Sequence, residues 1–355
     1  MKILHRLAAV LCAAAVSTAT PAFASPVAPA QLAGNAEVSQ LTVGKNLEQS
    51  FAWQNTVDGQ RVLEVWASSP AMDNRQVPLL VIKAQNPHRP VLYLLNGGDG
   101  GEGRANWVAQ TDVIDFYKSK DINVVIPMAG KFSYYTDWQQ PEPVLGGKQM
   151  WETFLTRELP GPIENLLQAN GRRAIAGMSM SATSALLLAE HNPRFYDATA
   201  AFSGCYASSK PVPWLFTAIT LQRGLTTPDK MWGPFGSPAW VWNDAMIQAE
   251  GLRGTEVYVS SGSGLAGEWD LPNGPRLRFE HPLVQSIAST STIVEGGIIE
   301  GATNACTHDL KVKLDKLNIP VQWNFRDTGT HSWGYWQTDL RDSWPVFERA
   351  FNRPE

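Results

Sequence analysis

Short apolar runs separated by helical patterns constrain the fold of this chain more than any other feature. From residue 90 on, the runs are continuously apolar, as in strands that are buried on both faces of a sheet. Helical patterns lie between several of them, at 106–120, 179–192 and 307–318. This alternation predicts an α/β fold with a mostly parallel central sheet flanked by helices on both faces. The strand-like runs are 61–67, 77–83, 90–96, 122–127, 173–178, 197–203, 255–261 and 320–325.

The first 24 residues have the organisation of a secretion signal. Two basic residues precede an apolar run at 7–16, and the small-residue pattern Ala-Phe-Ala follows at 22–24. The apolar run is shorter than the roughly 20 residues that span a bilayer. We therefore expect an exported protein without a transmembrane anchor. Residues 25–50 are small, polar and rich in Pro and Ala, which predicts a flexible lead-in to one large domain over 51–355.

The net charge of the chain limits the kinds of partner that it is expected to bind. The 355 residues carry a formal net charge of −4, and loss of the leader, which holds two positive and no negative charges, makes it −6. An acidic chain is a poor match for a nucleic acid or an anionic membrane. We expect neither as a partner.

The segment AIAGMSMSA at 174–182 carries the central chemical motif. A strand-like run ends in GMSMS, and a helical pattern follows at once. Such a turn lifts a serine hydroxyl above the sheet edge, where the next backbone N–H and the helix N-terminus point at the same space. Ser181 takes the last position, which usually holds glycine, and a small side chain meets the requirement. Ser179 is therefore the candidate nucleophile, and a plain helix N-cap serine is the alternative.

Four histidines follow Ser179 and could serve as its base. His191 lies near the end of the helix that starts at the serine, His281 lies in a loop, and His308 lies in an amphipathic helix. His331, within TGTHSWGYW, follows a late strand in a loop that can reach the edge of the sheet. No metal-ligand spacing surrounds this histidine, so we expect a base and no metal site.

A glycine-rich run, YLLNGGDGGEG at 93–103, follows another strand-like segment. It lacks the Gly-Lys-Ser/Thr of a phosphate loop, and its glycines do not open onto a helix as a dinucleotide fingerprint requires. Backbone N–H donation to an oxyanion suits the run better, together with the N–H that follows the nucleophile. We assign Gly98 and Met180 as the two donors; a plain turn is the alternative.

Four segments resemble one family, in the same order. They are IPMAGKFSYYTDWQQP, WETFLTRELP, AIAGMSMSATSALLLAEHNPRFYDATAAFSG and GTHSWGYWQTDL. They are similar to the trehalose mycolyltransferases, the antigen 85 family, and FSGCY and GTHSWGYW look more like the corynebacterial branch. The resemblance implies an α/β-hydrolase fold and a secreted enzyme without a cofactor. Its expected activity is transfer of a mycoloyl group from trehalose monomycolate to another trehalose monomycolate or to cell-wall arabinan.

The resemblance also implies the roles of single residues. Ser179 and His331 match the nucleophile and the base, and Glu300 matches an acid that lies about thirty residues before the histidine. Ser332 and Trp333 match residues of the sugar site. Other carboxylates remain open as the acid: Glu268 and Asp270, which follow the run at 255–261, and Glu295, which is misaligned with the family position.

Two positions depart from the mycobacterial pattern. The Asp-Gly-Leu-Arg run that holds trehalose there corresponds to Asn96-Gly97-Gly98-Asp99 here. Asn96 and Gly97 stay in the predicted substrate site, but the arginine contact is lost, and Arg104 is the candidate substitute. A second sugar-site aspartate falls on Ala207, which leaves the acceptor open.

Further expectations concern the rest of the chain. Cys205 and Cys306 form an even pair in an oxidising compartment, which makes them a candidate disulfide, with two buried thiols as the alternative. Segment 211–250 is rich in Pro, Trp and Gly and is expected to be a lid-like insertion. We place Trp333 and Trp232 near the ligand and expect a monomer. Two other functions remain open: a secreted carboxylesterase or thioesterase that uses water, and a non-catalytic wall-binding module.

Overall fold

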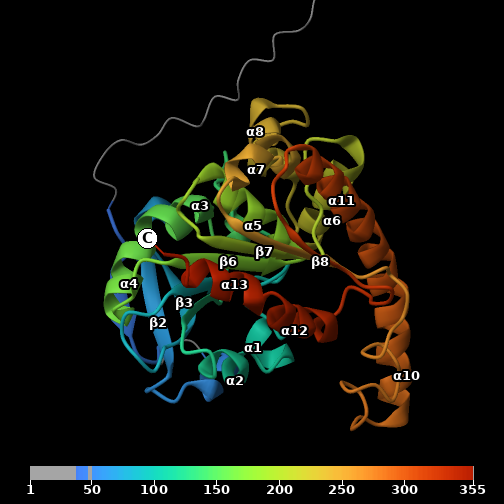
Figure 1. The fold of residues 1–355 in the computed structure, drawn as a ribbon, viewed down its shortest axis with the longest axis horizontal. Coiled ribbons are helices and arrows are strands. Elements are labelled where there is room, and N and C mark those ends of the chain that lie inside the picture. Colours follow the sequence, from blue (N-terminus) through green and yellow to red (C-terminus); the bar gives the residue numbers. More distant parts are fainter. Residues whose placement is uncertain (1–36, 47–49, 355) are drawn as a thin grey trace, which may run out of the picture.

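A nine-stranded sheet with helices on both faces forms the frame of the molecule (Figure 1). The computed structural model describes residues 37–46 and 50–354, so the predicted signal sequence lies outside the described residues. The strands are β1 Leu41–Val43, β2 Val62–Ser69, β3 Arg75–Ile82, β4 Val91–Leu94, β5 Asn123–Pro127, β6 Arg173–Met178, β7 Ala198–Phe202, β8 Glu256–Ser261 and β9 Gln322–Phe325. All eight predicted strands are present.

The order of the strands is β1-β2-β3-β5-β4-β6-β7-β8-β9. The pairs from β1 to β5 are antiparallel, and the pairs from β5 through β4 to β9 are parallel. The parallel strands are those with continuously apolar sequences, as expected for strands covered on both sides. The predicted α/β class with a mostly parallel sheet is confirmed.

Strand β1 corrects one prediction. Leu41–Val43 lies inside the predicted flexible lead-in, yet it pairs with β2 as an antiparallel edge strand. The Ser39 N–H donates to the Glu158 carbonyl at 3.0 Å and holds the start of this segment. The strand has three residues, and the side chains of Thr42 and Val43 are exposed, so its sequence carries too little apolar alternation to be recognised.

The helices follow the predicted positions with two differences. The helix expected at 106–120 is two short helices, because the backbone of Thr111 is extended (φ −140°, ψ 172°). The helix expected at 307–318 begins earlier, at Gly297. The helices are α1 Trp107–Gln110, α2 Val113–Lys118, α3 Trp151–Thr153, α4 Pro160–Leu167, α5 Met180–His191, α6 Pro211–Arg223, α7 Pro228–Trp232, α8 Pro238–Trp242, α9 Ala245–Gln248, α10 Pro282–Ser291, α11 Gly297–Lys316, α12 Trp333–Asp342 and α13 Trp344–Phe351. A π-helical stretch, Thr292–Gly296, joins α10 to α11.

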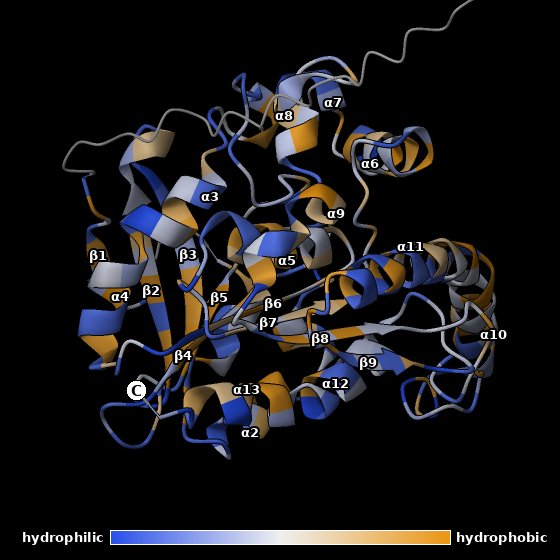
Figure 2. Ribbon diagram, turned by 45° about the horizontal axis from the view of Figure 1, so that its top comes forward, coloured by the Kyte–Doolittle hydropathy of each residue, from blue (hydrophilic) through white to orange (hydrophobic). Residues whose placement is uncertain are grey.

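The sheet separates two apolar clusters. Along β4, Val91 and Tyr93 pack in one cluster, and Leu92 and Leu94 pack in the other. This alternation arises because successive side chains of a strand point to opposite faces. Figure 2 shows hydrophobic residues throughout the strands and on the sides of the helices that cover them. Among the described residues, no helix is both long and apolar enough to cross a membrane.

Segment 211–250 lies between β7 and β8 and contains four short helices, α6 to α9. Its own tryptophans form a small core, in which the rings of Trp232 and Trp240 lie 4.8 Å apart. Trp232 is only 1% exposed, so the expectation that it faces the ligand is wrong. The ring packs between Trp240 of the insertion and Tyr134 of the body, and its Nε1–H donates to the Thr136 hydroxyl. Gly224, at the end of α6, packs against the Phe132 ring, where a Cβ would lie 2.6 Å from the ring carbons.

Candidate active site

The turn between β6 and α5 places Ser179 above the carboxyl edge of the sheet. Ser179 has φ 57° and ψ −121°, a strained backbone conformation that a residue with a side chain rarely adopts. Gly177 has no room for a side chain, since a Cβ would lie 2.2 Å from the Ser181 carbonyl oxygen. The Ser179 N–H donates to the Phe202 carbonyl at 2.9 Å. The turn is therefore fixed by close packing below and by a hydrogen bond to β7.

Ser181 supports this turn from inside. Its side chain is fully buried, and its hydroxyl accepts the Met178 N–H at 3.0 Å. The same hydroxyl donates to the carbonyl of Leu95 (3.3 Å) or of Met178 (3.1 Å). A serine in place of the usual glycine thus adds a link between the turn and the end of β4.

A chain of hydrogen bonds joins Ser179, His331 and Glu300. His331 Nε2 lies 2.7 Å from Ser179 Oγ, and His331 Nδ1 lies 2.8 Å from Glu300 Oε2. Because an ionised carboxylate only accepts, Nδ1 carries the hydrogen, and Nε2 is left to accept the serine proton. The Trp336 ring stands edge-on to the imidazole at 4.9 Å, and the His331 N–H donates to the Gly296 carbonyl at 3.0 Å. Both the ring and the backbone of the histidine are held.

Glu300 is a buried carboxylate with several donors. Its Oε1 accepts the Gly262 N–H at 2.6 Å and the Ser203 hydroxyl at 2.8 Å. Its Oε2 accepts the Thr303 hydroxyl at 3.2 Å in addition to the His331 ring. The side chain is fully buried, and such donors compensate a carboxylate for the water that it loses. They also leave one oxygen pointing at the imidazole.

Asp270, an alternative acid, holds the loop of His331 and not its ring. Its Oδ1 accepts the hydroxyls of Thr330 (2.6 Å) and Ser332 (3.2 Å), which are the two neighbours of the histidine. Its Oδ2 accepts the Tyr335 hydroxyl at 2.6 Å. Sequence reasoning missed this role. The three hydroxyl residues around the histidine are the signal that could have indicated a buried acceptor.

The other two candidate acids, Glu268 and Glu295, are exposed at the surface. Among the described residues, Glu300 is the carboxylate that is hydrogen bonded to His331. The structure thus places the acid predicted from the family resemblance next to the imidazole and leaves the other three away from it.

The two predicted oxyanion donors follow the ends of two neighbouring parallel strands, β4 and β6. Gly98 follows β4, and its carbonyl accepts the Phe132 N–H at 2.8 Å. Its own N–H donates to no acceptor in the described part of the chain. Met180 begins α5, where a helix supplies no acceptor for the first N–H groups. Both N–H groups are available for an oxyanion.

The side chain of Asn96 is not available to a sugar. It is fully buried, its Nδ2 donates to the Pro127 carbonyl at 2.9 Å, and its Oδ1 accepts the Trp107 N–H at 3.1 Å. These bonds join the ends of β4 and β5 to the start of α1. The predicted sugar contact of this side chain is corrected accordingly. Gly97 is packed as closely, because a Cβ there would lie 2.8 Å from Met178 Sδ.

The remaining predicted sugar-site residues differ in exposure. The Ser332 hydroxyl is buried and turned to Asp270. Trp333 is half-buried at the start of α12, with its ring edge-on to Trp107 at 5.3 Å. Arg104 is exposed in the loop that follows the glycine-rich run. Trp333 and Arg104 are therefore the members of this set that a ligand can reach.

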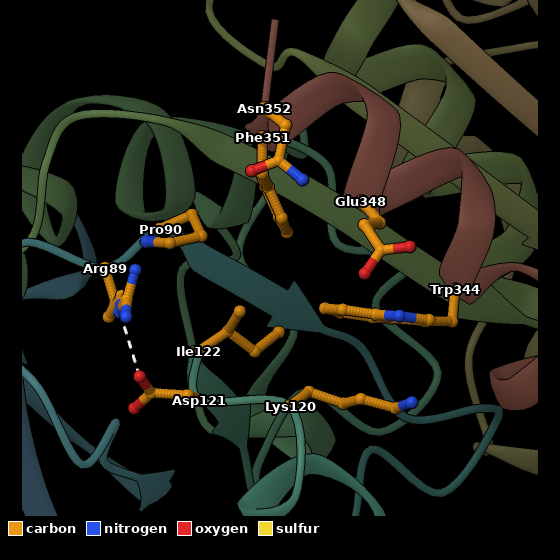
Figure 3. A pocket seen from close by; sticks show the side chains of 9 residues that line it. All are labelled: Arg89, Pro90, Lys120, Asp121, Ile122, Trp344, Glu348, Phe351 and Asn352. Carbon is orange, nitrogen blue, oxygen red and sulfur yellow. Dashed lines mark hydrogen bonds and ion pairs between the residues drawn. The ribbon is translucent and has the colours of Figure 1, made fainter.

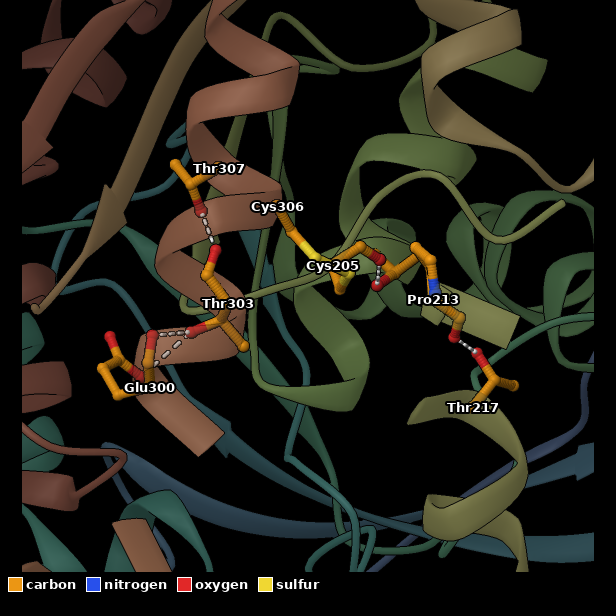
Figure 4. Close-up of a disulfide and its surroundings, with 8 residues drawn as sticks. Cys205, Pro213, Thr217, Glu300, Thr303, Cys306 and Thr307 are labelled. Carbon is orange, nitrogen blue, oxygen red and sulfur yellow. Dashed lines mark hydrogen bonds between the residues drawn. A yellow bond between two sulfur atoms is a disulfide. The ribbon is translucent and has the colours of Figure 1, made fainter. Parts of the chain in front are cut away.

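Cys205 and Cys306 form the predicted disulfide, with Cα atoms 4.9 Å apart (Figure 4). The bond joins the segment after β7 to α11. Glu300 lies on the same helix as Cys306, and Ser203, which donates to Glu300, precedes Cys205 by two residues. The disulfide thus connects the element that carries the acid to the element that carries one of its donors.

A hollow of about 160 Å³ lies at the other edge of the sheet (Figure 3). Pro90 and Ile122 line it, and they precede β4 and β5, whereas Ser179 follows β6. Because these strands are parallel, the hollow and the serine lie at opposite edges. Two of its charged side chains, Arg89 and Asp121, form an ion pair at 2.9 Å.

Known proteins resemble the chain in sequence and in structure. The family model described as "Putative esterase" matches residues 69–346. Diacylglycerol acyltransferase/mycolyltransferase Ag85A of Mycobacterium tuberculosis is 33% identical over 271 residues, which are 74% of this chain and 73% of that protein. The corresponding Ag85C of Mycobacterium leprae is 30% identical over 317 residues, or 83% of this chain and 87% of that protein.

Solved structures show the same fold. The crystal structure of Mycobacterium tuberculosis MPT51 has a TM-score of 0.64 and 24% identity, and the match covers 80% of this chain and 96% of that one. An S-formylglutathione hydrolase from Agrobacterium tumefaciens has a TM-score of 0.56 and 17% identity, with 86% and 99% covered. With the α/β-hydrolase sheet and its serine turn, the chain therefore belongs to the esterase family and, within it, to the Ag85 group of diacylglycerol acyltransferases/mycolyltransferases.

Proposed function

We propose that the protein is a secreted serine acyltransferase that moves a mycoloyl group from trehalose monomycolate to a second trehalose monomycolate or to cell-wall arabinan. The observation that carries the proposal is the hydrogen-bonded chain from Ser179 through His331 to Glu300, in a chain whose relatives are named mycolyltransferases. Secretion rests on the leader sequence at 1–24, and the disulfide is in keeping with an oxidising compartment.

The first half of the reaction loads the serine. Ser179 Oγ attacks the ester carbonyl of the donor while its proton passes to His331 Nε2, and Glu300 stabilises the imidazolium that forms. The N–H groups of Gly98 and Met180 stabilise the oxyanion of the tetrahedral intermediate. The intermediate collapses when the ester C–O bond breaks, and the departing trehalose hydroxyl takes the proton from Nε2. The acyl group is then esterified to the serine.

The second half of the reaction returns the serine. A sugar hydroxyl of the acceptor gives its proton to His331 Nε2 and attacks the acyl carbonyl, and Ser179 leaves with the proton that Nε2 returns. Transfer exceeds hydrolysis when the acceptor is well positioned and water is scarce. Segment 211–250 is our candidate for a lid that excludes water, because its Gly224 packs on Phe132, which lies 3.7 Å from the Cβ position of Gly98.

Purified mature protein with trehalose monomycolate tests the proposal. We expect trehalose dimycolate and free trehalose as products, and a fluorophosphonate probe should label Ser179. Free mycolic acid as the sole product, with or without added trehalose, would show a hydrolase. Failure of the probe to react with a folded protein would contradict catalysis by the serine.

A further inference from the structure

The helices α10 and α11 and the π-helical stretch between them form a continuous rod along one side of the molecule (Figure 1). In the first half of the rod, large apolar side chains face the solvent. Leu283 is 64% exposed, Ile287 63%, Val294 54% and Ile298 74%; we call these four residues the apolar stripe. A helix at the surface of a globular protein ordinarily turns its apolar side to the core. This part of the rod does the opposite.

The side of the rod that faces the body is polar or small. Ser289, Gly296 and Glu300 are buried there, and the Ser289 hydroxyl donates to the Asp270 carbonyl. Each of the three buried residues lies two positions after a member of the apolar stripe, which is about 200° around a helix. The stripe therefore lies on the side opposite the protein body, and no described part of the chain covers it.

Exposed apolar side chains are concentrated around the stripe. Among the described residues, nine of the twenty exposed large hydrophobic side chains lie between 265 and 299. Residues 281–294 contain no Asp, Glu, Lys or Arg. Figure 2 shows hydrophobic residues along α10, where it stands apart from the sheet. Stripe residues Ile287 and Val294 lie together on one open face of the rod. An extended apolar surface of this kind marks an interaction site.

The position of the stripe indicates what covers it. Ile298 lies two residues before Glu300, and the Gly296 carbonyl accepts the His331 N–H at 3.0 Å, so the rod that carries the stripe also carries residues of the candidate active site on its other side. The relatives are named for diacylglycerol and mycolate, which are lipids with long acyl chains. Such molecules gather in lipid layers, and an uncharged apolar helix face matches the acyl boundary of a layer.

We propose that the apolar stripe docks the protein on an uncharged lipid layer by burial of its side chains among acyl chains. Docking brings the rod that carries Glu300 to the layer that holds the acyl donor, with the stripe toward the layer and Glu300 toward the body; this last step rests on the proposed function, whereas docking itself does not. The layer carries no net charge, and residues 281–294 contain no Asp, Glu, Lys or Arg, so apolar burial supplies the binding free energy. Binding therefore depends on apolar area and not on ionic strength.

Co-sedimentation of the full mature chain with phosphatidylcholine vesicles tests the docking. We expect the wild type to bind to the same extent at low and high salt, and Ile287→Asp to lower the binding at least about tenfold, because burial of one such side chain contributes about 1.5–3 kcal/mol. Val312→Asp is the matched control. Val312 is 55% exposed on the same rod but lies beyond the stripe, between Lys311 and Lys313, so its variant should bind as the wild type does.

A soluble short-chain nitrophenyl ester separates docking from catalysis. Both variants should hydrolyse it at the wild-type rate, which shows that they are folded. Equal vesicle binding by Ile287→Asp and the wild type would overturn the docking, as would a wild-type dimer in ultracentrifugation that Ile287→Asp dissociates, since a second copy would then be the occupant. Normal docking without acyl transfer to trehalose would instead contradict the proposed function alone.

Discussion

Two histidine–glutamate pairs lie at opposite ends of α5, and they differ in what the second ring nitrogen contacts. At the start of the helix, His331 contacts Glu300 through Nδ1 and the Ser179 hydroxyl through Nε2. At the end of the helix, His191 Nδ1 lies 3.1 Å from Glu152. A hydroxyl can give a proton to an imidazole nitrogen, so the first pair is arranged as a base.

The second pair is arranged as an ion pair. His191 Nε2 lies 2.9 Å from the Trp242 carbonyl, which only accepts, so this nitrogen has to donate. Burial lowers the pKa of His191, but the Glu152 charge, the hydrogen bonds to Glu152 and to the Trp242 carbonyl, and the Asp137 charge together raise the pKa above its ordinary value. The ring stacks on Trp242 at 4.3 Å. A histidine beside a glutamate is thus a base only where its other nitrogen faces a proton donor.

The largest effect should come from the hydroxyl that only the first pair possesses. Replacing Ser179 with Ala should lower the rate of acyl transfer about 10⁵–10⁶-fold, because the nucleophile, base and acid act as one unit. Thermal unfolding should be nearly unchanged, since the serine side chain is small and half-buried. Residual transfer within tenfold of the wild-type rate would show that Ser179 is not the nucleophile.

Matched substitutions of the two glutamates should separate the pairs next. Glu300→Gln should lower kcat about 10³–10⁴-fold, because the amide no longer stabilises the imidazolium or fixes its tautomer. Glu152→Gln should change kcat less than about threefold, because its histidine has no part in the reaction. The measurement is steady-state transfer between trehalose monomycolates. Similar losses of kcat in both variants would show that the two histidine–glutamate pairs do not differ in their roles.

A smaller effect is expected at Asp270, which holds the loop on both sides of His331. Asp270→Asn should lower kcat about 10–100-fold with little change in KM, since a misplaced base costs rate more than binding. The amide cannot accept all of the hydroxyl donors. Exposed Glu268, two residues earlier, supplies the control: Glu268→Gln should behave as the wild type. The ratio of the kcat values of the two variants, together with their KM values, measures how much Asp270 contributes to the position of His331.

The smallest effect on activity should come from His191→Gln, with transfer within about threefold of the wild type. Its effect should be on stability. A raised folded pKa means that the stabilisation is fully present below the ordinary value of 6.5 and is lost as pH rises through the folded value. The wild-type unfolding free energy should fall with pH in this range, and at pH 6 the variant should be less stable by about 1–3 kcal/mol.

Two other titratable side chains help to separate the contribution of His191 from other effects of pH on stability. His308 is exposed and stacked on Phe325, and His308→Asn is the matched control for the removal of a histidine in the same measurement. Asp137 has its pKa raised to about 6 by burial and by the Glu152 charge, so its stabilisation is lost over the more acidic range from 3.8 to 6. A variant of His191 with the full wild-type slope above pH 6.5 would contradict the ion pair.

Much of the fold could be predicted because its signals are local. The apolar runs predicted eight strands, and the parallel ones were the clearest because both of their faces are buried. Strand β1 was missed because an exposed edge strand of three residues has no apolar pattern. The break at Thr111 and the early start of α11 at Gly297 were also missed, because tertiary packing sets the ends of both helices.

The candidate site also has parts that could be predicted from the sequence and parts that required the structure. The sequence by itself determined the serine turn, because consecutive residues fix a strand, a sharp turn and a helix start. The disulfide candidate followed from the two cysteines that lie beyond the predicted leader, but only the structure shows that the two meet. The family resemblance indicated Glu300 as the acid, but only the tertiary structure shows that Glu300, and not the equally buried Asp270, contacts the imidazole.

The direction of the apolar stripe was decided by the tertiary structure alone. Residues 283, 287, 294 and 298 have the spacing of a helix face, which from sequence indicates a side turned to the core. The buried carboxylate of Glu300 fixes the opposite face of the same rod toward the body, because its hydrogen bonds cannot be made elsewhere. The sequence thus determined that one face is apolar, and the contacts of the acid decided that it points outward.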